Sequence, residues 1–472
     1  MKTNRFICSL MAIAMMLMTA ACSTDDPMIP DDPGKTPETP EDPGDDAPEP
    51  EGPVFTDGLY IDEDGSVFVQ RDNGVDRVNG LLDAIESCAD QTVTTSETGT
   101  EIPCNNTFIL ERGGQYYCEG KWVIKNNVSI KAAEGDGNMP SIQIMADATG
   151  NINADMIRIE ANVAFEGIYF LGKDAMTGAN QQRMLRIDGE NCRVTLDHCF
   201  ADYTKNFFIY IQNTGSKIFL KNSTFRNMSY NASSNGRLVD TRESGADTVL
   251  IHNCLVYNNL GHIVRFNGNK VNYLEWTNNT FYNVGTKPEI SQPAKAVIEN
   301  NIFANVGWRN AAAAIGIDNE TQLFERDSVF WNIELVEEGT DISDVKITIR
   351  NNNIYNTPEM VQLYEKYPDT AIEPTLLSEG AEYLVAQGKM TYSDNIDEVL
   401  EYDNPAPIHY DFIDLYMSDT SAPDETYVGH EWVVDEDGVV GVIPGQVYTF
   451  GYPSSFRSAT ASTTGGPIGA SL

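Results

Sequence analysis

The chain has 472 residues and a formal net charge of −39 at pH 7, from 31 Lys and Arg against 70 Asp and Glu. Acidic residues are concentrated before residue 58 and between residues 359 and 437, and no stretch of the sequence is a basic stripe that could neutralise phosphate groups. Nucleic acid is therefore not expected as a partner, whereas an acidic glycan is compatible with the less charged part between them.

Residues 1–21 have the pattern of a signal peptide, in which basic residues precede an apolar run, Phe6–Met18, and three small residues. The run is too short to cross a membrane as a helix. Small residues before Cys22 resemble the processing box of bacterial lipoproteins, which implies that Cys22 is lipidated and anchors the chain to a membrane. The next residues, Ser23–Asp26, resemble the acidic tag of surface lipoproteins in Gram-negative gut anaerobes. We therefore expect an outer-membrane lipoprotein exposed at the cell surface.

Residues 22–57 consist mainly of Pro, Asp, Glu and Gly. Such a segment can bury too little apolar surface to offset the entropy of ordering, so it predicts an extended, solvated tether. The folded part is expected to begin near Leu59. Asn73–Cys88 has an amphipathic pattern of about three helical turns, which predicts a helix that caps one end of the fold. Asn106–Lys131 is then expected to form the first coil of a repeated structure.

One short phrase recurs between Gly167 and Asn356 at intervals of 22 to 31 residues. It reads apolar, any residue, Asn, small polar, any residue, apolar, any residue, Asn, and the intervening runs alternate like strands without helical spacing. A period of this length built from strands predicts a β-solenoid. We call the first Asn of the phrase the Asn slot. It is occupied by Asn222, Asn253, Asn278, Asn300 and Asn351 in clear copies, and by Gly167, His198 and Asp327 in degenerate copies.

The phrase has a mechanical interpretation. Asn tolerates the left-handed backbone region at a tight bend, and amides stacked on successive coils can form a hydrogen-bonded ladder. The later apolar residue of the phrase should point inward and stack with its equivalents along the core. This inward column is expected to contain Phe225, Val256, Phe281, Phe303, Phe330 and Ile354.

These motifs are similar to those of the right-handed parallel β-helix of the pectate-lyase-like superfamily. Together with the Gly-rich end, Thr463–Ala470, they resemble uncharacterised β-helix lipoproteins linked to glycan uptake in Gram-negative gut anaerobes. The resemblance implies an all-β fold, with a parallel β-helix and its N-terminal capping helix in residues 58–358. An acidic C-terminal region with an irregular cap would occupy residues 359–472. A leucine-rich repeat has the same period, but its leucine spacing and its helix are missing.

Six cysteines follow Cys22, an even number that permits disulfides in an exported protein. Cys199 and Cys254 both follow an Asn slot but lie two coils apart. Coils stack at about 4.8 Å, so these two cannot be bridged without distortion and are expected to be buried thiols. Pairing stays open among the other four, of which the first three fall at the capping end: Cys88, Cys104, Cys118 and Cys192.

A further strand is expected shortly after each Asn slot, and aligning these strands places their outward side chains in three columns. Ile187, Ile211, Thr241 and Phe266 would point inward between two of the columns. The face suits a sugar chain, because aromatic rings stack on pyranose faces and Arg pairs with uronate carboxylates. An ordinary solvated sheet face, in which Arg and Asp columns pair with each other, has the same pattern. The columns contain Arg186, Tyr210, Asp240 and Arg265; Asp188, Gln212, Arg242 and Asn267; and Arg183, Phe207, Arg237 and His262.

The first functional hypothesis is a surface lipoprotein that binds a polysaccharide for neighbouring proteins of a glycan-utilisation system. The polysaccharide would be uronate-containing and pectin-like, because the expected face is rich in Arg. The membrane would be contacted only through the N-terminal lipid. The predicted binding residues are Arg186, Tyr210, Arg237, Asp240, Arg242, His262, Arg265 and Asn267.

The second hypothesis is a polysaccharide lyase, which the resemblance to pectate-lyase-like proteins implies. Lyases on this fold remove the proton beside a uronate with an Arg or Lys base, while Ca²⁺ or cationic side chains neutralise the carboxylate. In this chain Arg242 or Arg265 would be the base, and Asp188 and Asp240 would be Ca²⁺ ligands. The phrases typical of polygalacturonases are missing apart from a partial Gly-His at His262. A third possibility is a structural or adhesive surface solenoid.

Overall fold

The structure is a computed structural model that describes residues 54–174, 177–228, 235–241, 243–308, 329–334, 339, 341–368, 375–418 and 448–472. The predicted signal peptide, Cys22, Asp327 and Arg242 lie outside these residues, as does the predicted tether up to residue 53. Within the described part of the chain, no helix is both long and apolar enough to span a membrane.

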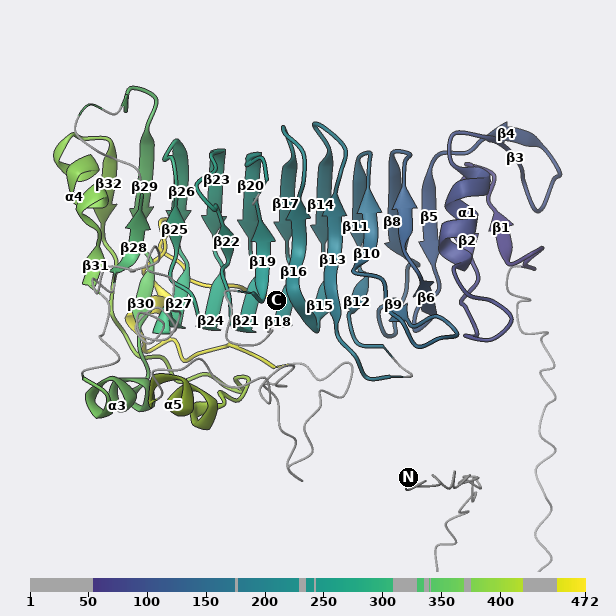
Figure 1. The fold of residues 1–472 in the computed structure, drawn as a ribbon. Helices are drawn as coiled ribbons and strands as arrows, with labels where there is room; N and C mark the ends of the chain where they lie inside the picture. The colour runs from purple at the N-terminus through teal and green to yellow at the C-terminus, as the bar shows by residue number, and fades with distance from the viewer. Residues whose placement is uncertain are drawn as a thin grey trace, which may run out of the picture. The chain divides into compact units, whose positions relative to one another are not determined.

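The described chain forms a parallel β-helix, which confirms the fold predicted from the repeats (Figure 1). Each coil contributes a strand to each of three walls in a fixed order, and the chain then returns to the first wall one strand further along. Side chains that point inward from the three walls make one continuous core.

The first wall is a twelve-stranded sheet within the described residues, parallel except for the β1–β2 pair at its start. Its strands alternate inward and outward side chains, as in Lys217–Lys221, where Ile218 and Leu220 are fully buried. The strands are β1 Leu59–Ile61, β2 Val67–Val69, β5 Thr107–Leu110, β8 Val128–Ala132, β11 Val163–Glu166, β14 Arg193–Asp197, β17 Lys217–Lys221, β20 Ala246–His252, β23 Val271–Thr277, β26 Lys295–Glu299, β29 Lys346–Arg350 and β32 Met390–Ser393.

The second wall is a nine-stranded parallel sheet, again counted within the described residues. Its strands are β6 Gln115–Glu119, β9 Ser141–Met145, β12 Tyr169–Leu171, β15 Phe200–Asp202, β18 Thr224–Met228, β21 Leu255–Asn259, β24 Thr280–Val284, β27 Ile302–Val306 and β30 Asn353–Tyr355. The predicted inward column runs along this wall in register, through Phe225, Val256, Phe281, Phe303 and Ile354.

Phe330 does not belong to this inward column, contrary to the prediction. Phe303 pairs directly with Ile354, so no strand lies between them. Phe330 lies on a strand of the third wall and packs edge-on against Phe303, with ring centroids 5.6 Å apart. The long segment between residues 307 and 328 places this strand one repeat period after Asn300, which imitates a further copy of the phrase.

The third wall consists of a six-stranded sheet followed by a three-stranded one, both counted within the described residues. The six strands are β7 Trp122–Ile124, β10 Asp155–Ile159, β13 Gln181–Ile187, β16 Thr204–Ile211, β19 Arg237–Asp240 and β22 Val264–Arg265. The three strands are β25 Glu289–Ile290, β28 Val329–Ile333 and β31 Thr375–Leu377.

The Asn slot lies at the bend between the first and second walls and has the predicted left-handed backbone. Its φ angles lie between 46° and 60° at Asn222, Asn253, Asn278, Asn300 and Asn351, and His198 has a φ of 50°. The second Asn of the phrase is left-handed as well, with φ between 52° and 54° at Asn227, Asn258, Asn283 and Asn305.

The buried amide ladder lies one residue beyond the Asn slot. In the slot itself, Asn253 Nδ2 donates to Asn222 Oδ1 at 2.8 Å, and Asn222 donates to Asp197 at 2.8 Å. The longer ladder is formed by successive side-chain amides at the next position, which also accept hydrogen bonds from the backbone of the preceding coil. Its members are Asn279, Asn301, Asn352 and Asn395.

The N-terminal cap is α1, Gly80–Cys88, which packs against the first strands of all three walls. The helix begins later than the pattern from Asn73 predicts. Asn73 Oδ1 accepts hydrogen bonds from the backbone N–H groups of Val75, Asp76 and Arg77, and this local turn competes with helix formation. A short hairpin, β3 Thr92–Thr94 and β4 Glu101–Pro103, follows the helix.

The C-terminal part contains α3 Pro358–Lys366, α4 Glu379–Ala386, α5 Tyr410–Ser418 and the short 3₁₀ helix Arg457–Ala459. The last coil extends past residue 358 to β32, and α4 packs on β28 and β32 at this end.

The last residues do not stay at the end of the solenoid. They run back along its side, where they hydrogen-bond in turn to Asn351, Asn300, Thr280 and Asn253 (Figure 1).

The six cysteines that follow Cys22 are all described, and each is buried and free. Cys199 and Cys254 are therefore the buried thiols that their spacing predicts. Burial raises the pKa of each of these two thiols to about 12, so both are protonated near neutral pH.

Candidate functional site

The register of the third wall confirms one predicted column of outward side chains and part of another, and leaves the column of Asp188, Gln212, Arg242 and Asn267 a prediction. Arg186 pairs with Tyr210, Tyr210 with Asp240, and Asp240 with Arg265. A second column aligns Arg183 with Phe207 and Arg237. We use the name arginine face for the outward side chains Asp155, Arg158, Arg183, Arg186, Asp188, Phe207, Tyr210, Arg237, Asp240 and Arg265.

Two carboxylates hold the first part of the arginine face together. Asp155 lies 2.5 Å from Arg183 and 3.4 Å from both Arg158 and Arg186. Asp188 lies 2.9 Å from Arg158 and 2.6 Å from Arg186. Burial alone would lower the pKa of Arg186, but the hydrogen bond to Asp188 and the charges of both carboxylates raise it above its ordinary value. The ion pairs thus fix the guanidinium groups in place, and the Arg186 guanidinium stays charged.

The aromatic residues of the face support the arginines and are not open platforms. Tyr210 is 7% exposed, and its ring stacks on Phe207 at 5.1 Å. Arg183 and Arg186 lie 5.7 and 5.9 Å from the centre of the Tyr210 ring. The Tyr210 hydroxyl donates to Glu243 at 2.8 Å. In this arrangement the Tyr210 ring has no free face on which a sugar could stack.

Only part of the predicted binding set reaches solvent. The side chains of Arg186 and Arg265 are 21% and 20% exposed, and those of Arg158 and Arg183 are 26% and 25% exposed. Asn267 is exposed. Tyr210, Arg237, Asp240 and His262 are buried, and Arg242 lies outside the described residues. The exposed group can touch a ligand directly, whereas the buried group can only position it.

The two predicted Ca²⁺ ligands are engaged by arginines. Asp188 contacts Arg158 and Arg186, while Asp240 is fully buried and lies 2.5 Å from Arg237 and 3.8 Å from Arg265. Within the described chain no group of three or more His, Cys, Asp or Glu side chains has a geometry that could hold a metal ion. The role of these aspartates as Ca²⁺ ligands stays a prediction.

A second polar cluster lies beside Arg265 on the same wall, and sequence reasoning missed it. Ser291 Oγ donates to one oxygen of Glu289 at 3.0 Å and lies 2.7 Å from one oxygen of Glu334. Asn332 Nδ2 donates to the other oxygen of Glu334 at 3.0 Å, and His262 Nε2 lies 3.7 Å from Glu289. We call this group the glutamate cluster, and its members are His262, Lys287, Glu289, Ser291, Asn332 and Glu334.

The environment separates the pKa values of the two glutamates. Burial, followed by the charge of Glu289, raises the pKa of Glu334 above its ordinary value of 4.5. Burial alone would raise the pKa of Glu289, but contacts with His262, Ser291 and Arg265 lower it below 4.5. Burial also lowers the pKa of His262 and of Lys287. One carboxyl group therefore keeps its proton to a higher pH than the other.

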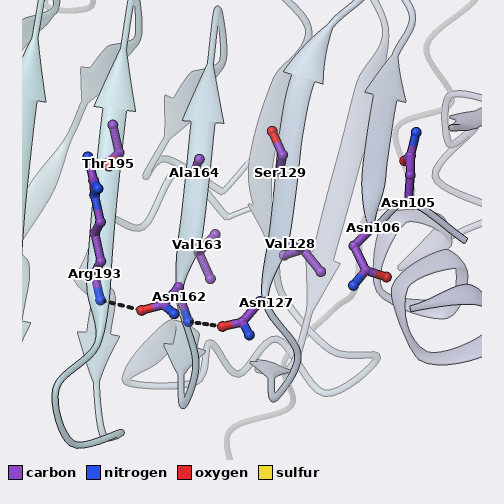
Figure 2. Close-up of a pocket in the computed structure, with 10 residues that line it drawn as sticks. All are labelled: Asn105, Asn106, Asn127, Val128, Ser129, Asn162, Val163, Ala164, Arg193 and Thr195. Carbon is purple, nitrogen blue, oxygen red and sulfur yellow. Dashed lines mark hydrogen bonds between the residues drawn. The ribbon is translucent and has the colours of Figure 1, made fainter. Parts of the chain in front are cut away.

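A shallow groove of about 490 Å³ lies on a different face, the outside of the first wall (Figure 2). Its edge carries Asn127 and Asn162, whose side-chain oxygens accept the backbone N–H of Asn162 at 3.0 Å and of Arg193 at 2.8 Å. The Arg193 guanidinium lies 4.4 Å from the centre of the Phe219 ring. The remaining lining residues are Asn105, Asn106, Val128, Ser129, Val163, Ala164 and Thr195.

Sequence reasoning did not find this groove, because it arises from small side chains at one outward position of successive strands. Ser129, Ala164 and Thr195 share that position in the strand register. Amide and hydroxyl groups at such a place can hydrogen-bond to sugar hydroxyls, and Arg193 can pair with a carboxylate. The groove is therefore an alternative binding surface against which the arginine face has to be tested.

Comparison with known proteins identified no relative of this chain. No protein-family model matches the chain, and a search of the curated proteins returned no significant match.

Proposed function

We propose that this protein binds an acidic polysaccharide, uronate-containing and pectin-like, along the arginine face. The observation that carries the proposal is the charge of that face in a chain whose formal net charge is −39. Its described residues include five arginines but only three aspartates, with Glu243 at the edge. Excess positive charge within the arginine face of an acidic protein favours an anionic ligand there.

The spacing of the arginines suits a polymer better than a small molecule. Arg158, Arg186 and Arg265 occur in one outward column at successive or nearby coils, which stack at about 4.8 Å. A glycan that runs along the solenoid axis would meet guanidinium donors at Arg158 and Arg186 and again, three coils after Arg186, at Arg265. The aspartates hold the guanidinium groups in place before binding, which reduces the entropy lost when carboxylates of the ligand are bound.

Retention of the full chain in gels that contain polygalacturonate tests the proposal. Replacing Arg186 and Arg265 together by alanine should weaken retention at least about tenfold, because each removes a charge-assisted contact worth roughly 1.5–3 kcal/mol. Retention should also fall with rising ionic strength, since the partly exposed charges are screened by salt. A neutral polysaccharide in the same gel should retain the protein weakly or not at all.

The Arg193→Ala variant is the matched control, because Arg193 lies on the first wall beside the groove. It should retain wild-type affinity. Loss of retention in this variant together with full retention of the double variant would place the glycan in the groove and contradict our assignment. Absence of retention on every acidic polymer would favour a structural or adhesive solenoid.

We propose further that the protein works as an outer-membrane lipoprotein that presents the glycan to neighbouring uptake proteins. The support is the signal-like segment before Cys22 and the acidic residues after it. In the Cys22→Ser variant the protein should lose incorporated fatty acid and leave the membrane fraction, because its lipid anchor cannot form. Labelled palmitate and membrane fractionation measure this, and unchanged membrane association would contradict the anchor.

A further inference from the structure

The glutamate cluster has the arrangement that general acid and nucleophilic chemistry requires. Both carboxylates contact the hydroxyl of Ser291, so they lie close together, and both belong to the wall that carries the arginine face. Glu289 is 15% exposed and Glu334 is half-buried, so a ligand on this wall can reach them. Catalytic carboxyl pairs in glycosidases work in such partly desolvated positions.

His262 supplies an independent sign that a ligand belongs here. Its side chain faces Glu289 through Nε2, the residue is 8% exposed, and no described residue forms a hydrogen bond with Nδ1. A buried polar atom without a partner is unfavourable, and such atoms in native structures often mark a binding or catalytic role.

We propose that the glutamate cluster hydrolyses a glycosidic bond, with Glu334 as the proton donor and Glu289 as the nucleophile. This inference rests on the proposed function, because the substrate is the polysaccharide held on the adjacent arginine face. Arg265 connects the two regions, since it pairs with Asp240 in the arginine face and its charge also acts on Glu289.

The reaction proceeds in two balanced steps. In the first, a Glu289 oxygen bonds to the anomeric carbon, the bond from that carbon to the glycosidic oxygen breaks, and the proton of Glu334 goes to the leaving oxygen. In the second, Glu334 takes a proton from water as the water oxygen bonds to the anomeric carbon and releases Glu289. The net reaction adds one water and produces two sugar ends, with both glutamates restored.

The shared contact with Ser291 predicts the stereochemistry. Two carboxylates that reach the same hydroxyl oxygen lie close together, as in retaining glycosidases, where the separation is about 5.5 Å. The wider separation of inverting enzymes leaves room for a water between the carboxylate and the sugar. The first product should therefore keep the anomeric configuration of the substrate.

The pH profile follows from the opposite directions of the two pKa shifts. Activity should rise as Glu289 loses its proton, below the ordinary glutamate value of 4.5, and fall as Glu334 loses its proton above that value. His262, Lys287 and Arg265 are the other charged or titratable groups that act on the pair. The hydrolysis rate plotted against pH is therefore expected to be bell-shaped, with one limb below pH 4.5 and the other above it.

The test incubates the full chain with polygalacturonate and with methyl-esterified pectin, and follows reducing ends and ultraviolet absorbance together. Wild-type protein should produce reducing ends without the absorbance of unsaturated sugars. Glu289→Gln and Glu334→Gln should each lower the rate at least about 100-fold, while gel retention of the polymer is kept. Glu299→Gln is the matched control, because Glu299 is also 15% exposed but lies on the first wall, and it should keep the wild-type rate.

The possible outcomes separate this inference from the proposed function. Retention of a polymer without new reducing ends, or with a rate that both glutamine variants keep, overturns hydrolysis at the cluster and leaves binding intact. New absorbance shows elimination and also overturns hydrolysis. Failure of both retention and cleavage overturns both proposals. Gel retention of the glutamine variants shows that they are folded.

Discussion

Replacing Asp202 with alanine is expected to lower the free energy of unfolding by about 3–5 kcal/mol, because it leaves the Arg226 guanidinium buried without its counter-charge. Both side chains are completely buried, and the Asp202 carboxylate lies 2.8 Å from Nε and from Nη2 of Arg226. Asn227 Nδ2 donates to the same carboxylate at 2.7 Å, and Tyr257 accepts a hydrogen bond from Arg226 at 3.1 Å.

The charge of Arg226 persists in this environment, which is why removing its partner is so unfavourable. Burial alone would lower the pKa of Arg226, but the charge of Asp202 and hydrogen bonds to Asp202 and Tyr257 raise it above its ordinary value. The arginine thus remains charged in the wild-type protein. In the Asp202→Ala variant the Arg226 guanidinium remains buried, but it has lost the negative charge and the hydrogen bonds that offset the cost of burying it.

Urea denaturation followed by circular dichroism measures the effect. Asp197→Ala is the matched control. Asp197 is 33% exposed, contacts His198 at 2.9 Å and accepts a hydrogen bond from Asn222 at 2.8 Å, and because water can replace these partners its loss should change stability by less than about 1 kcal/mol. Replacing both partners, as in Asp202→Leu with Arg226→Met, should recover much of the lost stability, since no charge is left buried. Equal effects of Asp202→Ala and Asp197→Ala would contradict this account.

The sequence contained enough information for the fold and for the strand register of the arginine face. A left-handed Asn fixes where each coil bends, so residues at equal distances from the bend become neighbours. Equal distance holds on the second wall, where Phe225 and Val256 each follow their slot by three residues. On the third wall Tyr210 and Arg265 follow their slots by 12 residues, whereas Arg186 and Asp240 follow theirs by 19 and 18. These four residues could be aligned because each precedes one inward residue in the alternating pattern of its strand.

The glutamate cluster could not be predicted in this way. Glu289 follows its Asn slot by 11 residues, whereas Glu334 follows Asn300 by 34 residues, because a long segment precedes β28. No constant offset therefore brings the two glutamates together, and the same insertion caused the wrong placement of Phe330. Solvent exposure could not be predicted either. The burial of Tyr210 and Arg237 depends on side-chain packing, which residue spacing does not determine.

The amide ladder accounts for the second large expected effect, a loss of about 3 kcal/mol or more on replacing Asn301 with leucine. Asn301 is fully buried, and its Nδ2 donates to the Trp276 carbonyl at 2.8 Å and to Asn352 at 2.9 Å. Its Oδ1 accepts from the backbone N–H and from the side chain of Asn279, both at 2.9 Å. Leucine has a similar size but leaves several of these partners buried and unsatisfied, at roughly 1–3 kcal/mol each.

The position next to the ladder supplies a control that separates hydrogen bonding from backbone geometry. Asn278 precedes the ladder residue Asn279, has a φ of 57°, and is partly exposed, so Asn278→Gly keeps the left-handed bend and should change stability by no more than about 1 kcal/mol. Urea midpoints of the two variants measured side by side test the difference. If Asn278→Gly lowers the stability more than Asn301→Leu does, the repeated asparagines act mainly through the bend. If Asn301→Leu lowers the stability more, the interior amides hold successive coils together, because each forms a buried hydrogen bond to the next coil.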